Sequence, residues 1–110
     1  MNRQQQIDAF LLEAHRLAVV RLRADPGRLV EVTRTLARWR QQAGPTRSDR
    51  YWDEWQSMLD AGIDAIEARA CGLDDHAAAL RTVSPVGVLI TSRERGELLR
   101  LAREDGNAAQ

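Results

Sequence analysis

The stretch DRYWDEWQSMLDAGIDAIEARACG, residues 49–72, has the most regular pattern in this sequence of 110 residues. Its large apolar residues recur every three or four positions, so they fall on one narrow face of a helix. They are Trp52, Trp55, Leu59, Ile63, Ile66 and Ala70. Ser48 or Asp49 can cap the start of this helix, and Gly72 ends it. The stretch therefore predicts one long amphipathic helix whose apolar face packs into a core.

Two further helices are predicted before this stretch. The first covers residues 2–24, where apolar residues recur at helical spacing. Asp25 can then cap a second helix, which has Pro26 at its first position and ends at Gly44. We expect these two helices to form a hairpin, against which the tryptophan edge of the 49–72 helix packs.

The segment after residue 72 contains the remaining helices. Asp74 can cap a short helix over residues 75–82. Residues 84–90 are apolar, but Pro85 and Gly87 interrupt any helix there, so we expect an extended apolar linker that crosses the bundle. The linker then positions the last helix.

That last helix begins with a capping box and should end at a glycine. Thr91 is followed three residues later by Glu94, and the helix is expected over residues 92–105 with its stop at Gly106. The whole pattern predicts an all-α fold, a small bundle of four main helices plus one short helix. Residues 1–106 form a single domain in this prediction, and residues 107–110 form a frayed tail.

The charges of the chain are balanced overall but differ between its halves. All 16 basic residues are arginine, and they match 16 acidic residues. Residues 1–50 hold ten arginines and five acidic residues, whereas residues 51–110 hold six arginines and eleven acidic residues. We interpret this asymmetry as two halves that pair with each other inside one fold.

Composition also predicts where the protein acts. The longest apolar runs are four or five residues, far shorter than a bilayer requires, so no membrane association is expected. A single cysteine, Cys71, has no partner for an internal disulfide, which is typical of a reducing compartment. We therefore expect a cytoplasmic protein.

Nine residues are candidates for contact with a partner. Tyrosine and arginine are common at the energetic centres of protein interfaces. A regular acidic stripe on the 49–72 helix offers a complementary surface, which could also dock onto Arg34 and Arg38. The candidates are Arg34, Arg38, Arg47, Arg50, Tyr51, Asp53, Asp60, Asp64 and Glu67.

No catalytic, cofactor or metal site is predicted. The acidic stripe has no histidine at the spacing of a metal site, and no glycine-rich phosphate loop occurs. Nucleic acid is an alternative partner, because residues 34–50 are rich in arginine, and the chain would then be a small DNA-binding transcriptional regulator. It is not favoured, since the connection 83–90 is too long for a helix-turn-helix. A homodimer is a further alternative, because short bundles often bury their apolar stripes in one.

A second alternative is catalytic. Arg69 and His76 form an Arg-x6-His string, which resembles the ribonuclease motif of HEPN-type helical domains. Gly72 interrupts the segment between them, and Ala70 stands where that motif has a polar residue. This resemblance implies a ribonuclease that uses Arg69 and His76.

Two segments carry another resemblance. Tyr-Trp-Asp-Glu-Trp at 51–55, together with the Leu-Arg, Ser-Pro, Gly-Val-Leu-Ile and Arg-Glu-Arg motifs between 80 and 95, is similar to small bacterial proteins encoded beside nucleotidyltransferase-type toxin genes. The resemblance covers about half of the chain. It implies an antitoxin-like partner and no enzyme. Our leading hypothesis is therefore a non-catalytic interaction or regulatory module that binds a protein.

Overall fold

The computed structural model describes the backbone of residues 2–108 and the side chains of residues 2–104. The described chain is all-α and forms a small helical bundle, as predicted. It has six α-helices and two 3-10 helices, where four main helices and one short helix were expected. In chain order they are α1 (Arg3–Ala24), η1 (Pro26–Arg28), α2 (Leu29–Ala43), α3 (Asp49–Ala61), α4 (Ile63–Ala70), α5 (Asp75–Thr82), η2 (Pro85–Leu89) and α6 (Ser92–Ala108).

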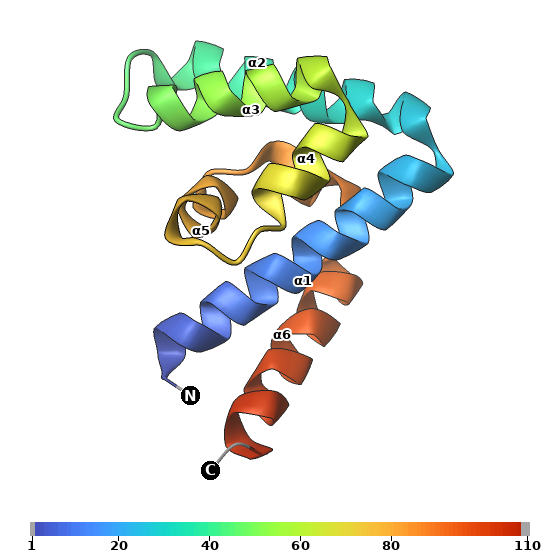
Figure 1. Cartoon of the computed structure of the whole chain (residues 1–110), viewed down its shortest axis with the longest axis vertical. Helices are drawn as coiled ribbons and strands as arrows, with labels where there is room; N and C mark the ends of the chain where they lie inside the picture. Colours follow the sequence, from blue (N-terminus) through green and yellow to red (C-terminus); the bar gives the residue numbers. More distant parts are fainter. Residues whose placement is uncertain (1, 109–110) are drawn as a thin grey trace.

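The helices lie in two groups (Figure 1). α2 and α3 lie side by side at one end of the molecule, while α1 runs away from them and packs against α4, α5, η2 and α6. The predicted hairpin of the first two helices is therefore wrong, because α2 pairs with α3 instead. The reason is η1, a single 3-10 turn that redirects the chain after α1.

The predicted 49–72 helix is also wrong in one respect, since it divides into α3 and α4 at Gly62. Gly62 has φ 114° and ψ −175°, a conformation that residues with a Cβ rarely adopt. The turn there still lets both helices bury their apolar faces, with Trp55, Leu59 and Ile66 all in the core.

Capping explains where several helices begin. The Asn2 side chain accepts from Gln5 N at the start of α1, and Asp74 accepts from Ala77 N at the start of α5. The capping box of Thr91 and Glu94 is confirmed, with both hydrogen bonds near 3 Å. Asp25 makes no side-chain cap, so α2 begins only after η1.

Four of residues 84–90 are buried while Val88 is exposed, and the segment is not extended as predicted. Pro85–Leu89 form the 3-10 helix η2, because Pro85 stands in its first turn and the Ser84 hydroxyl accepts from Val86 N. At the other end of the chain, α6 continues through Gly106 to Ala108, beyond the predicted stop. Residues 109 and 110 of the predicted tail lie outside the described residues.

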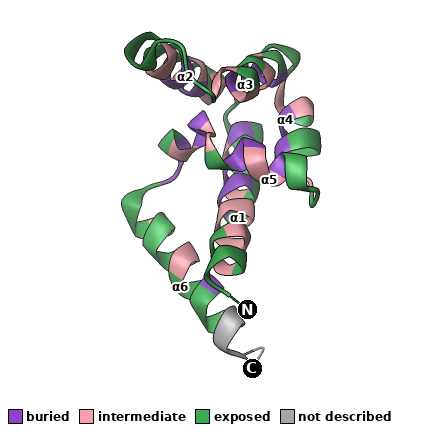
Figure 2. Ribbon diagram, turned by 90° about the vertical axis from the view of Figure 1, so that its left-hand side faces the viewer, coloured by how far each residue is buried: buried purple, intermediate pink, exposed green. Residues whose placement is uncertain are grey.

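The core lies where α1, α2, α3, α4, α5 and η2 meet, and buried residues gather on these inner faces (Figure 2). Its largest fully buried side chains include Leu22, Leu36, Trp55, Met58, Ile66, Leu80 and Leu89. Trp55 donates its indole N–H to the carbonyl oxygen of Leu80 at 2.9 Å, and Trp52 donates to that of Val83 at 3.0 Å. These bonds fasten α3 to the end of α5.

No helix between residues 2 and 108 combines the length and apolar character that a bilayer crossing needs.

Candidate functional site

The arginines predicted to bind a partner lie on and around the α2–α3 hairpin. Arg34 and Arg38 are on α2, Arg47 is in the connecting loop, and Arg50 is on α3. All four are exposed, and none forms an ion pair with another described residue. We call these four residues the hairpin arginines.

Tyr51 lies beside the last of these arginines and is half-buried. The Arg50 guanidinium lies 4.9 Å from the centre of the Tyr51 ring and donates to its hydroxyl at 3.1 Å. The ring also lies 5.9 Å from that of His76 on α5. A cation over an aromatic ring holds both side chains in one orientation, so Arg50 and Tyr51 present a joint surface.

The predicted acidic residues are mostly occupied within the fold. Arg40 pairs with Asp53 at 2.5 Å, and Arg23 pairs with Asp64 at 2.9 Å and with Glu67 at 3.0 Å. The two carboxylates on α4 raise the pKa of Arg23 by accepting its hydrogen bonds. The suggested docking of this stripe onto Arg34 and Arg38 is therefore wrong, since Arg40 and Arg23 are its partners.

Asp60 is the remaining member of the acidic stripe. It is exposed and accepts a hydrogen bond of 3.0 Å from the Gln56 amide, one turn earlier on α3. Because the break at Gly62 separates Asp53 and Asp60 from Asp64 and Glu67, the stripe does not run along a single helix.

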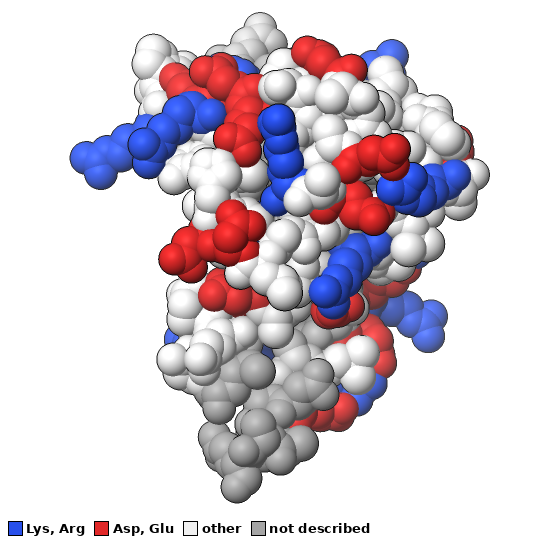
Figure 3. Space-filling view, viewed as in Figure 1, with Lys and Arg blue, Asp and Glu red and all other residues white. Residues whose placement is uncertain are grey.

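The charge asymmetry of the sequence is used inside the fold, as predicted. The partners of Arg23 and Arg40 all lie in the acidic half of the chain, and so does Glu94, the partner of Arg21. On the face in Figure 3, acidic and basic side chains are accordingly interspersed.

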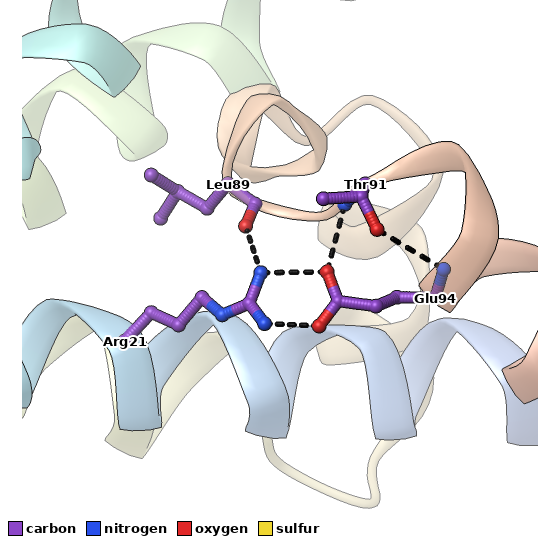
Figure 4. Close-up of polar contacts among 4 residues, drawn as sticks. All are labelled: Arg21, Leu89, Thr91 and Glu94. Atoms are coloured by element: carbon purple, nitrogen blue, oxygen red, sulfur yellow. Dashed lines mark hydrogen bonds and ion pairs between the residues drawn. The ribbon is translucent and has the colours of Figure 1, made fainter.

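The pair of Arg21 and Glu94 fixes the start of α6 (Figure 4). The Arg21 guanidinium donates to Glu94 through two nitrogens and to the carbonyl oxygen of Leu89 at 2.8 Å. These bonds, with those from Thr91, lower the pKa of Glu94 to about 2. One side chain of α1 thus holds the end of η2 and the beginning of α6 together.

A cavity of about 440 Å³ lies next to this junction, and the sequence did not predict it. It is bounded by α1, α2, the end of α5, η2 and the first turn of α6. Three arginines and a histidine line it, namely Arg38, Arg81, Arg95 and His15, together with the aromatic rings of Phe10 and Trp39. No acidic residue is among its lining residues.

Two of these polar side chains are buried. Arg81 is 6% exposed and donates through one terminal nitrogen to the carbonyl oxygens of Ala70 at 2.8 Å and Gly72 at 2.7 Å. His15 is 4% exposed, and its Nδ1 donates to the carbonyl oxygen of Leu11 at 2.7 Å. Burial lowers the pKa of His15 to about 4, so the ring is neutral at pH 7. Its Nε2 and the Nε of Arg81 have no partner among the described residues.

A second, shallower hollow brings together the residues of the ribonuclease alternative. Arg69 from α4 and His76 from α5 line it with Glu54 from α3. His76 Nε2 lies 2.9 Å from a carboxylate oxygen of Glu54. The two motif residues therefore face a common space although they stand on separate helices.

Cys71 offers no activated nucleophile. It is half-buried, and burial raises the pKa of its thiol, which keeps it protonated. Within residues 2–104, no three His, Cys, Asp or Glu side chains are placed to hold a metal ion.

Comparisons with known protein families, curated proteins and solved structures find no match to this chain.

Proposed function

We propose that this chain is a non-catalytic protein-interaction module of the antitoxin type, which binds its partner in the bacterial cytoplasm through the hairpin arginines. The observation that carries the proposal is that these four guanidiniums are exposed and unpaired within the described chain. Arg21, Arg23 and Arg40, in contrast, are each engaged by a carboxylate of the fold.

The chemistry of this surface favours an acidic partner. Guanidinium groups bind carboxylates through two parallel hydrogen bonds, and such pairs add orientation as well as affinity. Tyr51 adds a rigid aromatic surface beside Arg50, and arginine with tyrosine is a common composition at the centre of protein interfaces. The candidate acidic residues contribute less, because Asp53, Asp64 and Glu67 already have partners in the fold.

The resemblance of residues 51–55 and 80–95 to proteins encoded beside nucleotidyltransferase-type toxins supports the same proposal. It suggests that the acidic partner is the product of a neighbouring gene.

The test is an affinity capture of the tagged full chain from its own host, with and without nuclease, at low and high salt. The informative variant replaces all four hairpin arginines by glutamine. A matched control replaces Arg3, Arg93 and Arg103, which are exposed and unpaired among the described residues but lie on α1 and α6.

We expect one protein to be captured after nuclease treatment, to be lost with the hairpin variant and to be kept with the control. Capture of nucleic acid alone, released at high salt, would instead indicate the DNA-binding alternative. A captured protein that the hairpin variant retains in full would refute the proposed surface.

A ribonuclease is the second candidate, favoured by one observation: Arg69 and His76 line the same hollow as Glu54. In this alternative, Arg69 would stabilise charge on the phosphate and His76 would transfer a proton. It requires that the purified protein cleaves RNA and that His76→Ala abolishes the cleavage. Wild-type protein that leaves RNA intact would remove this candidate.

A further inference from the structure

The cavity between α1, α2, α5, η2 and α6 has the size of a small-molecule site. Its volume of about 440 Å³ lies within the range of pockets that enclose organic ligands. Its walls include the apolar side chains of Phe10, Trp39, Val86, Val88 and Ile90. The apolar part of a ligand could therefore be buried in this cavity.

The charge of the cavity is positive and uncompensated. The guanidiniums of Arg38, Arg81 and Arg95 line it, whereas no aspartate or glutamate does. None of the three forms an ion pair with another described side chain. A Cβ atom added at Gly87 would lie 3.1 Å from a terminal nitrogen of Arg95. The Arg95 guanidinium therefore lies against η2.

Two residues that line the cavity have a buried polar atom without a described partner. Arg81 is held by the carbonyl oxygens of Ala70 and Gly72, but its Nε–H donates to no described atom. His15 Nε2 carries a free lone pair, because Nδ1 bears the proton that is donated to Leu11. Buried donors and acceptors are nearly always paired in native proteins, so the Arg81 Nε–H favours a ligand with an oxygen acceptor, whereas the His15 lone pair would need a hydrogen donor.

We propose that this cavity binds a small organic carboxylate with an apolar or aromatic body, with the carboxylate on the arginines and the body against Phe10 and Trp39. The planar guanidinium matches a carboxylate through paired hydrogen bonds. This site goes beyond the proposed protein-binding function and does not depend on it, because Arg38 is the one residue shared with the hairpin arginines, whereas Arg81, Arg95 and His15 do not belong to them.

The test is an NMR titration of the full chain with hexanoate, benzoate and 3-phenylpropanoate. The chain has three tryptophans, and Trp39 is the one that lines the cavity, so its indole N–H signal is the reporter. Trp39→Phe identifies that signal. The neutral control ligand is 3-phenylpropanamide, which keeps the body and removes the charge.

We expect at least one carboxylate to shift the Trp39 indole and the amides of residues 10–15 saturably, with much smaller shifts at Trp52 and Trp55. The neutral 3-phenylpropanamide should bind at least roughly tenfold more weakly than 3-phenylpropanoate, because it loses one charge-assisted hydrogen bond.

The matched variants are Arg95→Gln, at the cavity, and Arg93→Gln, which is exposed on the same turn of α6 but does not line it. Arg95→Gln should weaken binding by roughly tenfold, and Arg93→Gln should leave it unchanged. Both residues are exposed, so neither change should disturb folding. The proposal is overturned if no carboxylate gives a saturable shift at Trp39, or if Arg93→Gln and Arg95→Gln weaken binding equally.

Discussion

Two pairs of buried side chains near α5 treat polar groups in opposite ways. In the first, the tryptophan pair, the indoles of Trp52 and Trp55 donate to the carbonyl oxygens of Val83 and Leu80, so the polar atoms of both side chains are satisfied. In the second, the cavity pair, Arg81 and His15 are also buried but keep one nitrogen each without a described partner. The two pairs are neighbours, since the rings of His15 and Trp55 lie 6.0 Å apart.

This difference separates stability from binding. Fully paired polar groups in a packed core hold one structure in place, whereas an unpaired buried group costs free energy. We therefore assign the tryptophan pair to the stability of the fold and the cavity pair to recognition of a ligand. The following predictions test this division.

Trp55→Ala should cause the largest loss of stability. The Trp55 side chain is fully buried, so its removal leaves a cavity and removes the indole hydrogen bond to the Leu80 carbonyl oxygen. We expect a decrease of about 4 kcal/mol in the free energy of unfolding, measured by chemical denaturation. Trp39→Ala is the control, because Trp39 lines the cavity and is only partly buried. An equal loss for both variants would remove the distinction between residues that stabilise the core and residues that line the cavity.

Acid should weaken the fold through His15. Burial lowers the folded-state pKa from 6.5 to about 4, so between these values the unfolded chain binds the proton that the folded chain excludes. Stability is therefore lost as the pH falls through this window, by about 3 kcal/mol in total. Denaturation curves between pH 7 and pH 4 measure this loss. The same curves for His15→Leu should be clearly flatter, and an identical slope would contradict the assignment.

A smaller acid effect should come from Glu94. Arg21 lowers the folded-state pKa of this carboxyl from 4.5 to about 2, so its stabilising effect is complete above the higher value. It is lost as the pH falls from 4.5 toward 2, which lies mostly below the window of His15. Glu94→Gln should remove this dependence and lower the midpoint of unfolding at pH 7.

The control for that prediction is Glu13→Gln, since Glu13 pairs only with Arg16 at the next turn of the exposed surface of α1. This variant should unfold like the wild type. If Glu94→Gln also unfolds like the wild type at pH 7, the link between α1 and the start of α6 contributes nothing to stability.

The local signals in the sequence predicted much of the fold. The capping residues Asp74, Thr91 and Glu94 act on neighbours three residues away, so their effect is visible in the sequence and appears in the structure. The break at Gly62 was missed, because the apolar pattern continues across it and only the backbone angle reveals the turn.

The sites depend on contacts between distant residues, which a local pattern does not contain. The partners of Arg23 lie more than forty residues away, and the sequence suggested other arginines for the same carboxylates. The cavity needs five elements to meet, and its buried Arg81 looks in the sequence like any exposed arginine of a short helix. His15 was noticeable only as a polar residue at the edge of an apolar face.

The most direct test of the division between the tryptophan pair and the cavity pair compares the unfolding free energies of Trp55→Phe and His15→Leu at pH 7.5. Each change replaces a buried polar side chain by an apolar one. Trp55→Phe should lose about 2 kcal/mol, because it removes a satisfied hydrogen bond to the Leu80 carbonyl oxygen and part of a fully buried ring system. His15→Leu should stay within about 0.5 kcal/mol of the wild type or exceed it, because it removes an unpaired buried nitrogen. A loss for His15→Leu as large as that for Trp55→Phe would show that both pairs serve stability alike and would contradict the account.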